Sequence, residues 1–233
     1  MPFRSSIALL TASALVLPGG AAAHDLWLEP EGEALVLRTG HRGAPPMPLD
    51  GSRVTSVRCL RGAPPPAEVR PRSTATATAL RAPGPCDVAS ATLDGGYWSL
   101  TPEGERNLPR TAVPDAVRSW RSLQLAKWVS VRSPAAGTVL GDDLEIVPVS
   151  DLSRARQGDK ATFRVLARGK PVAGAVLAVD HRPLGETDDA GECRVRIRAA
   201  DVESVTATVK RPLGQPEAET LVLEASLTFE VSR

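Results

Sequence analysis

Residues 221–231, LVLEASLTFEV, decide the fold class because apolar and more polar side chains alternate along them. Leu223, Leu227 and Phe229 fall on one face, whereas Glu224 and Ser226 fall on the other. Successive side chains of a β-strand point to opposite faces of a sheet, so this pattern predicts a half-buried antiparallel strand. One face of that sheet is therefore expected to cover a core.

The same alternation recurs upstream and predicts further short strands. They lie at 162–167, 175–179, 193–197 and 205–209. Turn-forming residues at 169–171 and 187–191 separate them, and the first strand is expected at 143–147. Short strands at this spacing are typical of a small β-sandwich, which we place at residues 141–233.

Residues 24–140 are expected to form a second, N-terminal β-rich lobe. Strand-like runs occur at 34–37, 54–60 and 74–80, and residues 115–131 are expected to hold a strand that enters the second lobe. Proline is frequent here and favours edge strands and loops. The sequence therefore predicts an all-β protein with two lobes.

The first 23 residues have the layout of a secretory signal. Arg4 precedes an apolar run, and Ala21, Ala22 and Ala23 form a small-residue cleavage site. The apolar run of about 11 residues is too short to span a bilayer, so no direct membrane anchor is expected. We therefore predict cleavage after Ala23 and a periplasmic or secreted protein that begins with His24.

Charge and cysteine content narrow the function further. The chain has 28 Lys and Arg against 27 Asp and Glu, and removal of Arg4 leaves 27 of each. Without a basic surplus, no nucleic-acid partner is expected. In an oxidising compartment we expect a disulfide between Cys59 and Cys86. Cys193 alternates with apolar residues and is expected to be a buried, structural thiol.

Several short motifs together resemble the DUF4198 family of exported proteins. They lie at residues 24–30 (HDLWLEP), 38–41, 96–98, 126–128, 141–148, 169–175, 187–191 and 226–229. The resemblance implies an immunoglobulin-like or transthyretin-like sandwich and a periplasmic role in nickel or cobalt uptake. A membrane component of a metal transporter is the partner that such a role implies.

The histidines are the candidate metal ligands. After cleavage, His24 would offer an α-amine and an imidazole, which can chelate one metal ion. His41 is the best second ligand because residues 34–37 can return past the N-terminus, and His181 follows a strand that can face the same site. Asp25 and Glu29 are candidate oxygen ligands. Imidazole nitrogen suits one divalent ion of nickel, cobalt or copper.

Three functions remain open at this point. The first is a non-catalytic metal-binding or delivery protein, and the second is a copper-binding protein with an N-terminal histidine brace. The third is a metal-free adaptor or structural module. No hydrolase motif is present, so no catalytic residue is assigned and the protein is not expected to be an enzyme. Asp188 and Asp189 are expected to form a turn, and the four tryptophans are expected to fill the cores.

Overall fold

The computed structural model describes residues 24–32, 34–45, 47–62, 67–68, 72–73, 78–80 and 85–232. These ranges contain β-strands and two short 3-10 helices, Gly51–Arg53 and Arg110–Ala112, and no α-helix. The all-β prediction is therefore confirmed. Neither short helix is long or apolar enough to cross a membrane. The predicted signal segment, residues 1–23, lies outside the described residues.

The strands are numbered along the chain. The N-terminal half holds β1 (Asp25–Glu31), β2 (Ala34–Gly40), β3 (Val54–Leu60), β4 (Ala67–Glu68), β5 (Arg72–Ser73), β6 (Thr78–Leu80), β7 (Val88–Thr101), β8 (Gly104–Arg106) and β9 (Arg118–Val129). The C-terminal half holds β10 (Glu145–Pro148), β11 (Lys160–Ala167), β12 (Lys170–Pro171), β13 (Val176–Val179), β14 (Arg182–Glu186), β15 (Glu192–Arg196), β16 (Val202–Gln215) and β17 (Ala218–Glu230).

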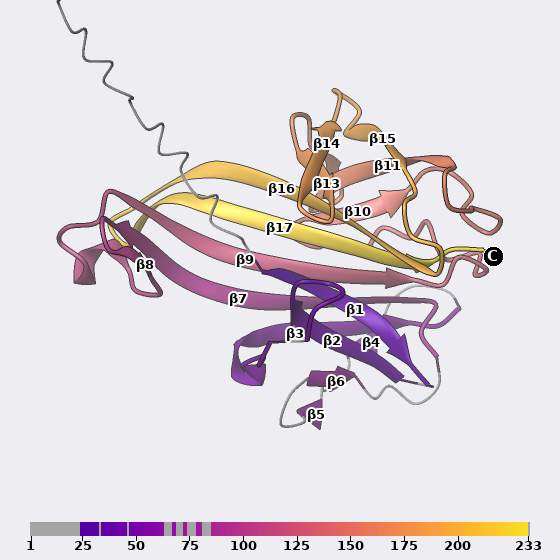
Figure 1. Cartoon of the computed structure of the whole chain (residues 1–233), viewed down its shortest axis with the longest axis horizontal. Coiled ribbons are helices and arrows are strands. Elements are labelled where there is room, and N and C mark those ends of the chain that lie inside the picture. The colour runs from indigo at the N-terminus through magenta and orange to yellow at the C-terminus, as the bar shows by residue number, and fades with distance from the viewer. Residues whose placement is uncertain are drawn as a thin grey trace, which may run out of the picture.

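A nine-stranded sheet forms the centre of the molecule. Its order is β14-β13-β16-β17-β9-β7-β3-β4, with β8 paired to β7. The sheet of β10, β11, β12 and β15 covers one face, and the sheet of β1, β2, β5 and β6 lies on the other (Figure 1). The sequence predicts a lobe boundary near residue 140. Strands from both sides of that boundary belong to this one sheet.

The two halves of the chain meet where β17 pairs with β9. This pairing is parallel and runs from Thr220 opposite Trp120 to Phe229 opposite Val129. The sequence predicts an antiparallel strand here. This is confirmed for the pairing of β17 with β16, which is antiparallel, and is wrong for its pairing with β9. Parallel neighbours need a long connection, and here residues 130–217 supply it.

The alternation in β17 is confirmed and separates two cores, but the strand is not half-buried as expected, because Ser226 and Thr228 on its polar face are also buried. Leu223, Leu227 and Phe229 are buried against β10 and β11, where Phe163 lies 5.8 Å from Phe229 between ring centroids. The opposite face of β17 meets β1, and there Ser226 donates to the carbonyl of Leu26. This hydroxyl satisfies a backbone carbonyl that would otherwise be buried without a partner.

A buried ion pair lies within the larger core. Lys127 on β9 and Glu145 on β10 are 2 % and 1 % exposed, and their Nζ and Oε2 atoms are 2.7 Å apart. Lys127 also donates to the carbonyl of Thr138. Glu145 accepts from the backbone of Leu140 and Gly141, so its carboxylate holds the incoming loop against β9.

The cysteines pair as the sequence predicts. Cys59 at the end of β3 is bonded to Cys86, which lies just before β7. Cys193 is unpaired and only partly buried, although it packs beside the larger core. Burial raises the pKa of its thiol, so it is not an activated nucleophile.

The tryptophans divide into two kinds. Trp27 and Trp128 are buried, in agreement with the prediction. Trp98 and Trp120 are partly exposed on β7 and β9, with ring centroids 6.3 Å apart and ring planes 9° from parallel. For this second pair the prediction was wrong, because β7 and β9 extend beyond the sheet that would cover them (Figure 1).

Candidate metal centre

The β1–β2 hairpin brings two of the three histidines together. The antiparallel register pairs Asp25 with Gly40, so His24 and His41 lie side by side at the open end of the hairpin. Their ring centroids are 5.2 Å apart. The chain reverses at Gly32, whose φ of 61° suits glycine. Local pairing is thus sufficient to place these two imidazoles.

His181 reaches the same place from the C-terminal half. It lies in the two-residue turn between β13 and β14, where Val179 pairs with Arg182. Asp180 and His181 have φ values of 49° and 58°, the left-handed conformation that such tight hairpins need. Asparagine and glycine usually occupy these positions, and a histidine there carries backbone strain.

The three imidazoles form one cluster. His41 and His181 have ring centroids 4.9 Å apart, and His41 Nδ1 lies 2.9 Å from His181 Nε2. The same Nε2 atom is 3.3 Å from Asp25 Oδ2. His24 is exposed and packs edge-on against His41. The sequence names all four residues as candidates, and the fold brings them together.

Two carboxyl groups lie close together at the cluster, Asp25 beside His181 and Glu224 beside Asp25. Asp25 is buried, and burial raises the pKa of its carboxyl, although the nearby His181, His41 and Arg42 oppose the shift. Burial also raises the pKa of Glu224 to about 7, with a further contribution from the charge on Asp25. The floor of the cluster is therefore acidic and poorly solvated.

The donor spacings can be compared with those around a metal ion. In the described ranges, no three His, Cys, Asp or Glu side chains have donor atoms already converged to hold a metal. Two ligands about 2.05 Å from one metal are about 2.9 Å apart at a right angle and about 3.3 Å apart at the tetrahedral angle. His41 and His181 are hydrogen-bonded at 2.9 Å and His181 lies 3.3 Å from Asp25, and these two contact distances also match the metal-ligand spacings. Rotation of the exposed His24 side chain would be needed to complete the set.

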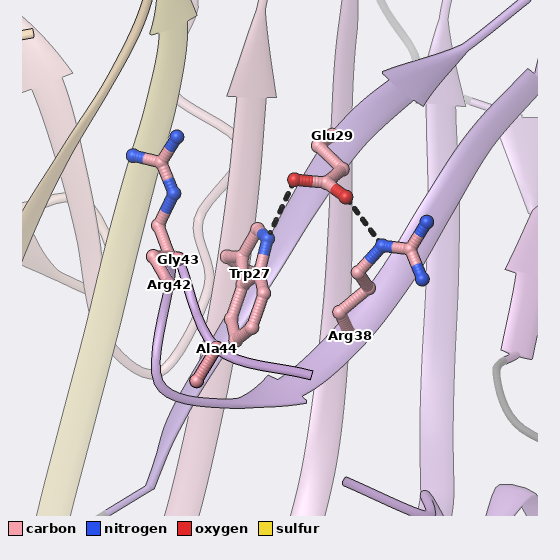
Figure 2. A pocket seen from close by; sticks show the side chains of 6 residues that line it. All are labelled: Trp27, Glu29, Arg38, Arg42, Gly43 and Ala44. Carbon is pink, nitrogen blue, oxygen red and sulfur yellow. Dashed lines mark hydrogen bonds and ion pairs between the residues drawn. The ribbon is translucent and has the colours of Figure 1, made fainter. Parts of the chain in front are cut away.

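Glu29 is not available to the cluster. Its carboxylate accepts from the indole Nε1 of Trp27 at 2.9 Å and forms an ion pair with Arg38, as Figure 2 shows. The expectation that Glu29 adds an oxygen ligand is therefore wrong. These residues border an open cavity of about 370 Å³, which Arg42 also lines.

Arg42, Gln124 and Glu224 belong to the site although the sequence did not single them out. Arg42 follows His41 and donates to the carbonyl of Val202 at 3.0 Å, which ties the hairpin to the C-terminal half. Gln124 on β9 donates to the carbonyl of His24. In the sequence, these polar side chains look like solvent-facing residues. Gln124 and Glu224 come next to the site because β1 lies across β9 and β17.

The acidic turn at residues 187–191 is structural. Asp188 Oδ1 accepts from the backbone nitrogens of Ala190 and Glu192 at 3.0 and 2.9 Å. This carboxylate closes the turn before β15, as the sequence predicts.

Comparisons with known proteins identify a family. The family described as "Domain of unknown function (DUF4198)" matches residues 21–210. No curated protein resembles the chain closely enough to count as a match.

Two solved structures that match the chain contain immunoglobulin or fibronectin(III)-like domains. The four N-terminal Ig domains of Dscam1 isoform 1.9 are 11 % identical with a TM-score of 0.25, and the match covers 76 % of this chain and 37 % of that one. The fibronectin(III)-like modules of Clostridium thermocellum CbhA are 12 % identical with a TM-score of 0.25, covering 91 % and 92 %. The chain thus spans little more than a third of the Dscam1 structure it matches. These similarities carry no information about function.

Proposed function

Because this chain belongs to the DUF4198 family, whose description assigns no function, we propose a role from its own residues: a periplasmic, non-catalytic protein that binds or delivers one transition-metal ion. The ligands in this proposal are His24, His41 and His181. Asp25 supplies an oxygen from below.

One observation carries the proposal. The chain has only three histidines, and all three meet in one cluster. His41 and His181 are 140 residues apart in sequence, and the latter occupies a strained turn position. Strain of this kind persists where the surrounding structure fixes the backbone conformation, and it clusters at binding and active sites. Imidazole nitrogen is a common ligand for nickel, cobalt, copper and zinc.

Nickel or cobalt is the metal we propose, and the motif resemblance to exported nickel- and cobalt-uptake proteins supports it. His41 Nδ1 and His181 Nε2 are hydrogen-bonded at 2.9 Å, so both nitrogens are close enough to bind one metal ion in place of the shared proton. Tetragonal geometry with nitrogen donors suits Ni(II) and Cu(II). A copper site with an N-terminal histidine brace would use the same residues and is the second candidate.

Export completes the proposed site. The leader-like residues 1–23 support cleavage after Ala23, which would free the α-amine of His24 as a further nitrogen donor. The receiving partner in this proposal is a membrane component of a metal transporter. A metal-free adaptor would need none of these groups.

Calorimetric titration tests the proposal. Protein beginning at His24 is titrated with Ni(II), Co(II), Cu(II) and Zn(II), and we expect one tightly bound ion. His41→Gln and His181→Asn should each abolish tight binding, and asparagine tolerates the left-handed turn. Asp180→Asn changes the same turn but keeps every imidazole, so it should bind like the parent. Absence of binding for all four metals would leave the adaptor.

A further inference from the structure

The strand β1 lies across β17 in a regular register. Thr228 Oγ1 donates to the carbonyl of Leu28, and Ser226 Oγ donates to the carbonyl of Leu26. Both bonds join residues 200 apart in sequence, so the two strands advance together in steps of two residues. The next step of this register places Glu224 beneath His24.

The backbone nitrogen of His24 faces the same way. On a β-strand, the N–H and C=O of one residue point to the same edge. The carbonyls of Leu26 and Leu28 point away from β2 toward β17, and the carbonyl of His24 accepts from Gln124. Gln124 is the register partner of Glu224 in the β17–β9 pair. The nitrogen of His24 therefore points to the edge of β1 that faces β17 and β9, the pair of strands that carries Glu224 and Gln124.

The carboxyl of Glu224 has no cationic partner in the part of the chain that the structure describes. Within those ranges it makes no hydrogen bond or ion pair, and its side chain is partly buried beside Asp25. At 226 and 228 the same face of β17 carries hydroxyls that donate to β1. An ionised carboxylate cannot donate, so Glu224 interrupts that series. A partly buried carboxylate is stabilised by a positive partner.

We propose that Glu224 binds the free α-amino group of His24 that cleavage after Ala23 creates. The inference rests on the proposed export of the protein. Before cleavage, the nitrogen of His24 is an uncharged amide; afterwards it is an ammonium that can form charge-assisted hydrogen bonds. A metal-bound amine keeps two N–H groups, so Glu224 can still accept a hydrogen bond from it and hold it in place.

A double-mutant cycle on metal-free protein tests the inference. Four proteins are compared by thermal unfolding: chains that begin at His24 or retain Ala21–Ala23, each with Glu224 or with Glu224→Gln. We expect the chain that begins at His24 to unfold about 2–4 °C higher than the longer one, the shift of one such hydrogen bond in a protein of this size. Glu224→Gln should reduce this difference by at least half, because the amide oxygen that remains carries no charge. Glu230→Gln, at the exposed end of β17, should preserve it.

Acylation of the α-amine gives a second, direct measurement. The terminal amine of the chain that begins at His24 should react several-fold faster in the Glu224→Gln protein, as measured by mass spectrometry of the terminal peptide. Equal rates, or a difference in unfolding temperature that Glu224→Gln leaves undiminished, would overturn the inference. If the difference in unfolding temperature depends on Glu224 but no metal binds, the contact between Glu224 and the amine is supported and the metal site is contradicted. If metal binds but the difference does not depend on Glu224, the metal site is supported and the contact is contradicted.

Discussion

The buried pair of Lys127 and Glu145 tests how the two halves of the chain are held together. Both side chains are almost fully buried between β9 and β10. Burial lowers the pKa of Lys127, and the carboxylate of Glu145 opposes this shift. The ion pair with Glu145 therefore offsets part of the cost of burying the Lys127 ammonium.

Replacing Lys127 with methionine leaves Glu145 buried without a counter-ion. Removing one partner of a buried pair costs about 3–5 kcal/mol. For a chain of about 200 residues each kcal/mol lowers the unfolding temperature by about 2–4 °C, so we expect a loss of about 6–20 °C.

The assay is thermal and denaturant unfolding of the Lys127→Met protein beside the Lys127→Met, Glu145→Gln double variant. The glutamine side chain of the double variant has no charge and keeps an oxygen to accept from Leu140 or Gly141. The double variant should therefore recover at least half of the lost stability. If Lys127→Met unfolds within about 2 °C of the parent, or if the double variant is less stable than the single one, the reasoning is refuted.

Three further predictions concern stability and the site. Loss of the Cys59–Cys86 disulfide, which closes a 27-residue separation, should cost about 3–4 kcal/mol in denaturant unfolding; no change on reduction would count against it. His181→Gly should stabilise the metal-free protein by up to about 1 kcal/mol, because glycine relieves the left-handed strain, while abolishing metal binding in calorimetry. In a chain that retains residues before His24, the raised pKa of Glu224, about 7, means that the folded state binds more protons than the unfolded state between about pH 4.5 and 7. Its stability should therefore fall as pH rises through that window, and Glu224→Gln should flatten the profile.

Much of the fold follows from strand periodicity. The alternation in residues 221–231 predicts β17 because every second side chain is buried in a core. The strand expected at residues 115–131 is β9. Periodicity does not say which strand lies beside which, so the parallel pairing of β17 with β9 could not be predicted. The 14-residue β7 was also missed, because Gly95 and Gly96 interrupt its pattern at a bulge.

Part of the candidate site can be predicted from the sequence, and part depends on how distant segments pack. His24 and His41 can be brought together from sequence, since a hairpin joins them. The position of His181 depends on packing between segments that are far apart in sequence. Glu224 falls on the polar face of an alternating strand and reads as solvent-facing, and it is covered only because β1 crosses that face. Lys127 was missed for a similar reason, because its charge predicts exposure.

The most direct test of the central claim is a crystal structure of the chain that begins at His24, loaded with Ni(II), with anomalous diffraction at the nickel edge. We predict one anomalous peak about 2.0–2.1 Å from His41 Nδ1 and His181 Nε2, with a nitrogen of His24 completing the set. A peak elsewhere on the molecule, or no peak while His41 and His181 keep their 2.9 Å contact, would contradict the account.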